Sequence, residues 1–368
     1  MATTPPQGRV GVVGASTRAA VHSLARAGHA AWASDLFADR DLARVAPCAA
    51  CPADGYPDRL IDLADGFPAG PVLFTGGLEN YPAVVQRLAA TRELWGNPPA
   101  VLAATRDPYH VFAVLAAAGF KAPVLTSRTD GCPATGRWVR KPFRSASGLG
   151  MRLANPGEPP ADTHYFQEFV DGVALSAVYV DAELFGVTRQ LVGESWVHAR
   201  PFAYAGNIAV ADDDFREAFA RLGRFGHAEF RLRGVWNIDC VAADGELYVL
   251  EFNPRYSASV EVIEHASGRA VWSEASAARP THVVGKAVYY AHFDLTFPAA
   301  GPWDADLADA FDPWRLPAYA DIPHADSQIA GGQPVLTVFA SGSDTRECCE
   351  ALQSRAAELD ALFAGVTP

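Results

Sequence analysis

Three polar side chains stand at alternate positions in a short stretch near the middle of the chain. They are Glu251, Asn253 and Arg255, in the sequence EFNPR. If this stretch is a β-strand, alternate side chains point to the same face of the sheet. Carboxylate and amide oxygens are ligands that Mg²⁺ prefers, and a neighbouring arginine could hold an anion such as a phosphate.

A β-hairpin would bring a second carboxylate to the same place. Apolar runs flank Asp244-Gly245, and Asp-Gly between such runs is typical of a tight turn between antiparallel strands. Asp239 lies on the first strand of this hairpin and Glu251 on the second. We therefore expect Asp239, Glu251 and Asn253 to form a metal site. A lone carboxylate would be better explained as part of an ordinary surface hairpin.

Lysine is rare in this chain. The only lysines are Lys121, Lys141 and Lys286, so 27 of the 30 basic residues are arginines. A retained lysine is informative, because a planar guanidinium does not replace a compact ammonium group at a tight phosphate site. Lys141 ends a predicted strand, and the small-residue loop 142–150 follows it. Such a loop can bring backbone N–H groups to phosphate oxygens, although an ordinary hairpin turn remains the alternative.

The elements that position these residues predict an α/β chain of several domains. A length of 368 residues exceeds that of one simple core. Short buried strands alternate with helices at the start of the chain, which predicts a parallel sheet, and an antiparallel pattern follows. We expect an N-terminal α/β domain at 1–103, a central region at 104–275 and a β-rich C-terminal extension with a final helix at 276–368.

Local patterns also predict individual elements in the second half of the chain. The segment 195–202 continues the antiparallel strands, and acidic residues at the start of 212–223 predict an amphipathic helix. Helices are expected at 261–268 and 347–363. The Pro-rich segment 297–323 is expected to be a loop.

Composition and short motifs argue against several classes of protein. A net charge of −12 disfavours a sequence-independent grip on nucleic acid. The sequence shows no apolar run of membrane-spanning length and no signal-peptide pattern at its start, so we expect a cytoplasmic protein without a membrane partner. Cys48 and Cys51 lack a second pair at zinc-finger spacing. Gly11, Gly14 and Asp35 match the dinucleotide-binding fingerprint only in part.

Taken together, these residues resemble the ATP-grasp superfamily over nearly the whole chain. The resemblance implies an α/β (overall α+β) ATP-grasp fold with a small parallel α/β domain before it and a small β-rich extension after it. It implies ATP and Mg²⁺ as cofactors, with Mn²⁺ as a substitute. Members activate a carboxylate as an acyl phosphate, from which an amine then displaces phosphate. The implied metal ligands are Asp239, Glu251 and Asn253, the catalytic residues are Lys141 and Arg255, and the ATP-binding residues are Arg106, Lys141, Ser147, Gly148, Gly150, Gln167, Glu168 and Val170.

Two positions depart from the superfamily pattern. Arg106 stands where many members carry a phosphate-contacting lysine, and Ala174 stands where many carry a ribose-binding glutamate. Whether Arg106 contacts phosphate and which group binds ribose therefore stay open.

A narrower resemblance links the chain to tyramine–glutamate ligase and its relatives, which are connected with methanofuran-type one-carbon cofactors. It rests on the stretches GASTRAA, DLFADRDL, TGGLENYP, LWGN, NPRYSASVEV and ADIP. It implies a γ-glutamyl amide made from glutamate and a small amine such as tyramine. Candidate substrate residues are Arg18, Glu79, Tyr204 and Lys286, with Trp196 and Phe202 as a further aromatic wall; each of them could equally be a packing or capping residue.

Other interpretations stay open beside this one. The chain could be a non-catalytic or regulatory ATP-binding protein, or an ATP-grasp ligase for a different amino acid. Biotin-dependent carboxylation would require a carrier partner, and no carrier motif is present in the sequence. The acceptor amine, the number of glutamates added and the choice between a monomer and a homodimer are not fixed by the sequence.

Overall fold

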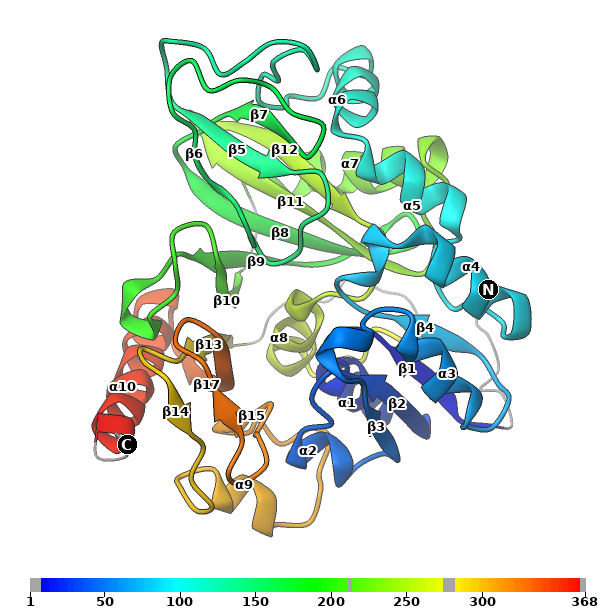
Figure 1. Cartoon of the computed structure of the whole chain (residues 1–368), viewed down its shortest axis with the longest axis vertical. Helices are drawn as coiled ribbons and strands as arrows, with labels where there is room; N and C mark the ends of the chain where they lie inside the picture. The colour runs from blue at the N-terminus through cyan, green and yellow to red at the C-terminus, as the bar shows by residue number, and fades with distance from the viewer. Residues whose placement is uncertain (1–7, 211–213, 274–281, 365–368) are drawn as a thin grey trace.

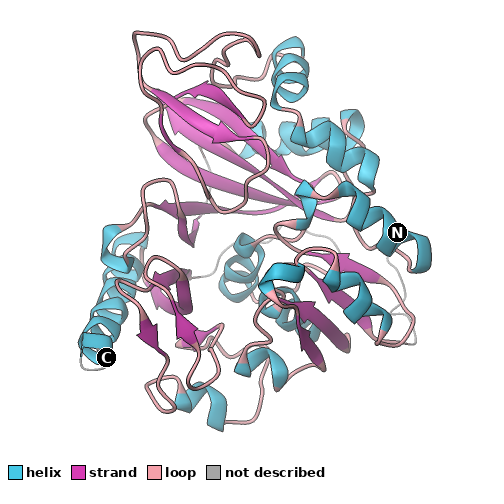
Figure 2. Ribbon diagram, viewed as in Figure 1, coloured by secondary structure: helices cyan, strands magenta, loops and turns pink. Residues whose placement is uncertain are grey.

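The computed structural model describes residues 8–210, 214–273 and 282–364, and the statements below refer to these residues. Three groups of elements surround helix α8 (Ala258–Ser267), which lies near the centre of the molecule (Figure 1). They are an N-terminal parallel sheet with its helices, a small sheet with helices beside it, and a large antiparallel sheet that continues into the C-terminal part (Figure 2). This arrangement confirms the predicted fold class.

The N-terminal part is a four-stranded parallel sheet in the order β3-β2-β1-β4. Every residue of β1 and β2 is buried, which is typical of parallel strands covered on both faces. Apolar side chains of α1 pack on one face, and those of α3 and α4 pack on the other. The elements are β1 (Val10–Val13), α1 (Arg18–Arg26), β2 (Ala31–Asp35), α2 (Arg40–Ala43), β3 (Cys48–Ala50), the 3₁₀ helix η1 (Ala53–Gly55), α3 (Arg59–Asp65), β4 (Val72–Phe74), the 3₁₀ helix η2 (Leu78–Asn80) and α4 (Pro82–Thr91).

A small three-stranded antiparallel sheet in the order β6-β5-β7 follows, with its preceding helices alongside. The strand predicted to carry Lys141 is confirmed as β5, and β7 carries Gln167 and Glu168, two of the residues expected to bind ATP. The elements are α5 (Pro99–Arg106), α6 (Pro108–Ala117), β5 (Trp138–Pro142), β6 (Arg152–Leu153) and β7 (His164–Glu168).

An eight-stranded antiparallel sheet forms the largest layer, in the order β12-β11-β8-β9-β10-β13-β17-β15. The expected domain boundary near residue 275 lies between strands of this one sheet. Its strands and the remaining elements are β8 (Val173–Val180), β9 (Glu183–Val192), the 3₁₀ helix η3 (Ser195–Val197), β10 (Tyr204–Val210), α7 (Arg216–Glu229), β11 (Val235–Ala243), β12 (Glu246–Asn253), β13 (Val283–Tyr290), β14 (Leu295–Thr296), α9 (Asp304–Ala308), β15 (Tyr319–Ala320), β16 (Gln328–Ile329), β17 (Pro334–Gly342) and α10 (Thr345–Ala364).

Alternating side chains decide which helix covers which face of the large sheet. Val178 packs in the same core as α8 and α1, whereas the next residue, Tyr179, packs against Phe219 of α7. A Cβ atom placed on Gly186, opposite Val178 in β9, would lie 2.7 Å from Ile263 of α8. The side of the sheet that carries α8 is thus fixed by close packing.

Two of the sequence-based element predictions need correction. The segment 195–202 is not a strand: it forms η3, and His198 and Phe202 have left-handed φ angles of 58° and 66°, which interrupt an extended chain. The helix predicted at 212–223 is α7, which runs on to Glu229, and Asp212 lies outside the described residues. Gly223, where the predicted helix ended, lies inside α7. The absence of a side chain there lets α7 pack closely against Tyr179.

The Pro-rich segment and helix α8 also differ from expectation in detail. The segment 297–323 contains α9 and β15, because Trp303 and Tyr319 are buried in the C-terminal core and order it. Helix α8 starts three residues before the predicted position, directly after Ser257. The last helix occupies the expected region.

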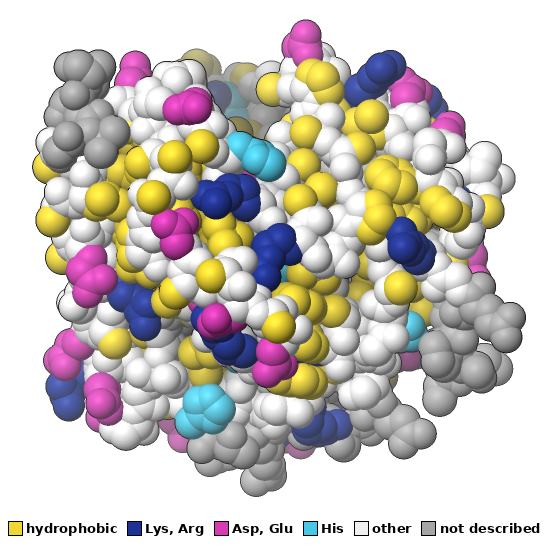
Figure 3. Space-filling model, turned by 90° about the horizontal axis from the view of Figure 1, so that it is seen from below, with side chains coloured by type: hydrophobic (Ala, Val, Ile, Leu, Met, Phe, Trp, Pro, Cys, Tyr) yellow, Lys and Arg dark blue, Asp and Glu magenta, His cyan; other side chains and the backbone are white. Residues whose placement is uncertain are grey.

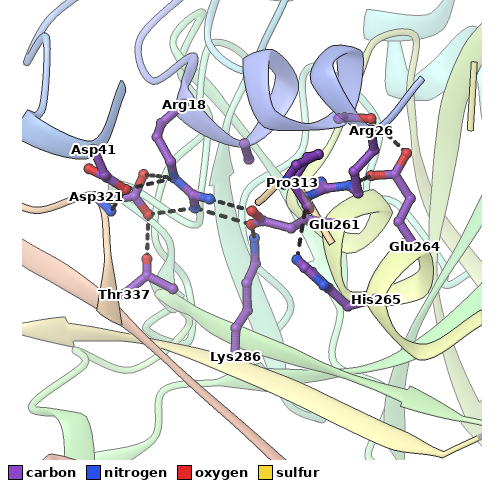
Figure 4. A network of polar contacts seen from close by, with 12 residues as sticks. Arg18, Arg26, Asp41, Glu261, Glu264, His265, Lys286, Pro313, Asp321 and Thr337 are labelled. Atoms are coloured by element: carbon purple, nitrogen blue, oxygen red, sulfur yellow. Dashed lines mark hydrogen bonds and ion pairs between the residues drawn. The ribbon is translucent and has the colours of Figure 1, made fainter. Parts of the chain in front are cut away.

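A buried network of ion pairs joins the N-terminal part to α8 and the C-terminal strands (Figure 4). The guanidinium of Arg18 donates to both carboxylate oxygens of Glu261 and to both of Asp321, and its Nε lies 3.6 Å from Asp41. Lys286 Nζ donates to Glu261 at 3.0 Å. Arg18 and Glu261 are each about 1% exposed. Water cannot replace these contacts, so each charge depends on its partners.

No described helix is long and apolar enough to cross a membrane. On the face seen in Figure 3, basic and acidic side chains are interspersed with apolar ones.

Replacing Arg18 by Met should lower the free energy of unfolding by about 3–5 kcal/mol, because buried carboxylates then lose their main cation. Urea denaturation followed by circular dichroism measures the change. Arg346→Met is the matched control, since Arg346 forms an exposed pair with Glu350 on α10; it should leave the unfolding midpoint nearly unchanged. Equal, small effects of both substitutions would contradict a stabilising role for the network.

Candidate nucleotide and metal site

The predicted hairpin is present, and it brings the two acidic side chains face to face. Strands β11 and β12 pair in antiparallel register, with Asp239 directly opposite Glu251. Asp244 and Gly245 both have positive φ angles, 51° and 75°, as a tight two-residue turn requires. The hairpin predicted from the Asp-Gly pattern is confirmed.

Amide groups surround the carboxylate of Asp239. Gln190 of β9 and Asn237 of β11 donate to its Oδ1 at 2.9 and 3.0 Å, and Asn253 donates to its Oδ2 at 2.9 Å. Burial and then the negative charge of Glu251 raise the pKa of Asp239 to about 7, against weaker opposing effects of its hydrogen-bond donors. Two facing acids of which one resists ionisation are an arrangement that a cation would stabilise.

Positive charges lie on the other side of Glu251. Burial alone would raise the pKa of Glu251, but Lys141, Arg106 and Arg255 lower it below its ordinary value. Arg106 Nη1 lies 3.8 Å from Glu251 Oε2. The Lys141 ammonium is buried and donates to Gln167 Oε1 at 3.3 Å. Glu251 therefore stays charged, with basic side chains near it and Asp239 opposite it in the hairpin.

One pocket is lined by several of the predicted nucleotide-binding residues. It lies between α5, α6, β5, the following loop and β12. The predicted residues that line it are Arg106, Lys141, Ser147, Gly148 and Glu251. Tyr165 and Phe143 add aromatic surface, so the pocket combines phosphate-binding charge with an apolar wall of the kind that holds a base.

The glycine-rich loop after β5 folds back against the start of β10. Gly148 has a φ of 74°, and a Cβ atom there would lie 1.9 Å from the carbonyl oxygen of Phe202, so only glycine allows this approach. The carbonyl of Ser147 accepts a hydrogen bond from Tyr204 N at 3.1 Å. Gly150 has a φ of 76° and lies outside the pocket lining.

Three of the residues expected to bind ATP, Gln167, Glu168 and Val170, lie at the end of β7 or just after it. Gln167 pairs with Val139 of β5, and its side chain reaches Lys141. Glu168 donates its backbone N–H to the carbonyl of Val124 at 2.8 Å and accepts from Val124 N through its side chain. Val170 follows the strand in a loop. Of these residues, Gln167 has direct side-chain contact with Lys141, and none of the three lines the pocket.

Arg255 already has a carboxylate partner from the N-terminal part. Its Nε and Nη2 donate to Glu79 Oε1 at 3.2 and 3.0 Å, and Nη2 also donates to Asn253 Oδ1 at 3.2 Å. Glu79 is about 1% exposed, and its Oε2 has no hydrogen-bond partner among the described residues. The structure thus joins Glu79 and Arg255, two residues that the sequence assigned separately to substrate and catalysis.

The other residues predicted to bind substrate are occupied by protein partners. Arg18 and Lys286 belong to the buried network of Figure 4, where Glu261 contacts both. Tyr204 directs its hydroxyl to Asn207, and Trp196 packs against the C-terminal core. This geometry argues against a direct role of Arg18, Lys286 and Trp196 in holding substrate.

The sequence did not single out two amides that contact Asp239. Asn237 could have been found, because it lies two residues before Asp239 on the same strand face and opposite Asn253. Gln190 is 49 residues away in sequence, and no local pattern connects it to Asp239.

The donor set around Asp239 fits a hard divalent cation. Asp239, Glu251 and Asn253 offer carboxylate and amide oxygens, and the buried Asn237 Oδ1 beside them has no hydrogen-bond partner in the described part of the chain. Within residues 8–210, 214–273 and 282–364, no group of three or more His, Cys, Asp or Glu side chains is arranged to hold a metal ion. The candidate site accordingly depends on amide as well as carboxylate oxygens.

Comparison with known proteins assigns the fold. Residues 105–259 match the model of the ATP-grasp domain, and the chain has the ATP-grasp fold. The L-amino acid ligase of Bacillus licheniformis is similar over 96% of this chain and 98% of its own, with a TM-score of 0.65 and 12% identity. The biotin carboxylase domain of 2-oxoglutarate carboxylase from Hydrogenobacter thermophilus, solved with MgADP, ADP and bicarbonate, is similar over 90% of this chain and 86% of its own, with a TM-score of 0.66 and 13% identity.

A curated relative is similar in sequence over part of the chain. The carbamoyl phosphate synthase large chain of Beutenbergia cavernae is 27% identical over 240 residues, which cover 56% of this chain. The chain spans only 21% of the length of that relative. These similarities establish the fold and do not identify the particular reaction.

Replacing Lys141 by Arg should weaken ATP binding by on the order of tenfold, the scale of one charge-assisted hydrogen bond, because the bulkier planar guanidinium does not fit the buried ammonium position. Isothermal titration calorimetry with ATP and Mg²⁺ measures the affinity. Lys121→Arg is the matched control, since Lys121 is exposed and pairs with Glu246 at the far end of β12. Unchanged affinity in Lys141→Arg would remove Lys141 from the phosphate site.

Proposed function

We propose that the protein is an ATP-dependent carboxylate–amine ligase that forms an amide through an acyl phosphate. The observation that carries the proposal is the arrangement around Glu251: Lys141, Arg106 and a glycine-rich loop line one pocket with it, and Asp239 faces it across the hairpin. This combination suits MgATP, because the cations neutralise phosphate oxygens while the carboxylates and amides hold the metal. The ATP-grasp fold supports the same conclusion.

Each side chain has a stated task in this proposal. Asp239, Glu251 and Asn253 would hold Mg²⁺, and a bound Mg²⁺ supplies charge neutralisation at the terminal phosphates. Lys141 and Arg106 would contact phosphate oxygens. Arg255 would stabilise charge on the transferred phosphoryl group. The glycine-rich loop would exclude water, which would otherwise hydrolyse the acyl phosphate.

The reaction balances without a further reactant. A carboxylate oxygen attacks the γ-phosphorus of ATP, and ADP leaves. The amine nitrogen then attacks the acyl carbon, phosphate leaves with one former carboxylate oxygen, and the amine loses a proton to solvent. The order follows from the chemistry, because a free carboxylate has no adequate leaving group for an incoming amine.

Glutamate is the proposed carboxylate and a small aromatic amine such as tyramine the proposed acceptor, in the assembly of a one-carbon carrier. The support for this finer statement is the resemblance of the stretches TGGLENYP and NPRYSASVEV to the tyramine–glutamate ligase group. Glu79, whose Oε2 lacks a partner among the described residues, is a suitable contact for the amine beside Arg255. Arg18 and Lys286 are left out of this proposal because Glu261 already contacts both.

The proposal is tested by ADP release from purified protein with ATP, Mg²⁺, glutamate and tyramine, against mixtures that lack one component. ADP release should require both the carboxylate and the amine. With ¹⁸O in the γ-carboxylate, one labelled oxygen should appear in each released phosphate. Label that never enters phosphate would exclude the acyl phosphate, and ATP binding without ADP release for any pair of substrates would favour a non-catalytic ATP-binding protein.

Glu251→Gln should lower turnover by on the order of 10² or more, since it removes a preorganised charge from the metal site, while its position near a strand end leaves folding nearly intact. Steady-state rates at saturating ATP measure the effect. Glu246→Gln is the matched control, because Glu246 lies at the exposed start of the same strand; it should keep normal turnover. A Glu251→Gln protein with near-normal rates would refute the metal assignment.

A further inference from the structure

Asn80 of the N-terminal part contacts Arg106 of α5 and Ser145 of the glycine-rich loop, and both of these residues line the pocket. It ends the 3₁₀ helix η2, which follows strand β4 of the N-terminal sheet. The turn is held in place by Gly77, whose φ is 98° and where a Cβ atom would lie 2.3 Å from the hydroxyl of Tyr56. The side chain of Asn80 is thereby presented to the glycine-rich loop from a fixed position in another part of the fold.

Asn80, Arg106 and the carbonyl of Ser145 are joined to one another by hydrogen bonds. Asn80 Oδ1 accepts from Arg106 Nη2 at 2.9 Å, and Asn80 Nδ2 donates to the carbonyl of Ser145 at 3.1 Å. Arg106 Nη2 donates to the same carbonyl at 3.0 Å. One amide thus orients the arginine beside Glu251 and holds Ser145 of the loop, and both of its polar atoms are used.

The loop is held at a second place on its other side. The carbonyl of Ser147 accepts from Tyr204 N at 3.1 Å, and the Ser145 hydroxyl donates to the carbonyl of Leu149 at 2.7 Å. Because the Tyr204 contact uses backbone groups, the side-chain contacts of the loop with the rest of the site come from Asn80 and Arg106, and Arg106 also reaches the carbonyl of Phe143 at 3.5 Å. Losing the Asn80 contact would leave Arg106 as the only side chain that reaches the carbonyl of Ser145 among the described residues.

We propose that Asn80 is a positioning residue that latches the glycine-rich loop and fixes Arg106 over the nucleotide pocket. The inference rests on the proposed function for the use of the pocket by ATP, but the latch itself is a property of the chain. The N-terminal part then sets the geometry of the phosphate site from outside the ATP-grasp domain. Its two adjacent residues each hold one arginine of the site: Asn80 holds Arg106, and Glu79 holds Arg255.

Two substitutions separate the two tasks of Asn80. Asn80→Asp keeps an acceptor for Arg106 but replaces the donor to Ser145 by an oxygen that repels the carbonyl. Asn80→Ala removes both contacts. In Asn80→Asp the loop should be held more weakly, by Arg106 alone, while Arg106 stays oriented; in Asn80→Ala the orientation of Arg106 should be lost as well.

Limited trypsin digestion without nucleotide measures loop release directly. Arg144 is exposed and immediately precedes Ser145, so cleavage after Arg144 follows the population of released loop. Mass spectrometry of the 1–144 fragment should show cleavage about tenfold faster in both variants, the scale of one lost hydrogen bond. Cleavage at Arg144 that is as slow in both variants as in the unmodified protein would overturn the proposal.

Glu79→Gln is the matched control, because Glu79 lies in the same turn but contacts Arg255 and not the loop. Its cleavage rate at Arg144 should equal that of the unmodified protein, and an equal acceleration would overturn the specific role of Asn80. Thermal unfolding reports the overall fold. If Asn80→Ala does not fold, Asn80→Asp alone decides the test.

A kinetic readout distinguishes positioning from general stability. The KM for ATP should rise about tenfold in Asn80→Ala, where Arg106 loses its orientation, and by less than about threefold in Asn80→Asp. Equal KM values in the two variants would contradict the orientation of Arg106 by Asn80. The digestion needs no turnover. A protein that releases no ADP would therefore refute the ligase proposal, while the digestion would still test whether Asn80 holds the loop.

Discussion

The opposition of two carboxylates across neighbouring strands is the constraint on which the rest of the site depends. Asp239 and Glu251 face each other in β11 and β12. Two neighbouring carboxylates that are partly removed from water repel each other, so ionising both is unfavourable unless positive charges compensate. The chain meets the difficulty from both sides. Burial and the charge of Glu251 raise the pKa of Asp239 to about 7, and amides donate to its carboxylate, while Lys141 and Arg106 keep Glu251 ionised. A divalent cation bound by both carboxylates would complete this balance.

The cations of the site are in turn held by residues from another part of the chain. Glu79 and Asn80 reach across from the end of β4 to Arg255 and Arg106. This contact requires that the N-terminal sheet sit at a fixed position against α8, and the buried pairs of Arg18 with Glu261 and Asp321 provide it. The network in Figure 4 therefore acts on the site indirectly, by fixing the frame from which Glu79 and Asn80 project.

Local patterns were sufficient for the parts of the site that one hairpin or one strand encodes. Asp-Gly between apolar runs predicted the hairpin that carries Asp239 and Glu251, and the scarcity of lysine drew attention to Lys141. The register shift between Asp239 and Cys240, which places Asp239 opposite Glu251, is not encoded in the turn pattern. Long-range pairing could not be predicted in this way. Nothing in the sequence indicates that Arg18 has a carboxylate partner, because Glu261 is 243 residues away. On the sequence alone, Arg18 is therefore a candidate for binding substrate. The prediction of a strand at 195–202 was wrong, because the pattern of apolar residues does not reveal that His198 and Phe202 adopt left-handed φ angles.

The most direct test of the central claim is a crystal structure with Mn²⁺ and a non-hydrolysable ATP analogue, in which anomalous scattering locates the metal. The account predicts a manganese peak about 2.1 Å from oxygens of Glu251 and Asp239 or Asn253. It also predicts a phosphate oxygen in hydrogen-bond contact with Lys141 Nζ. An analogue bound elsewhere, or metal density that does not touch the β11–β12 hairpin, would contradict it.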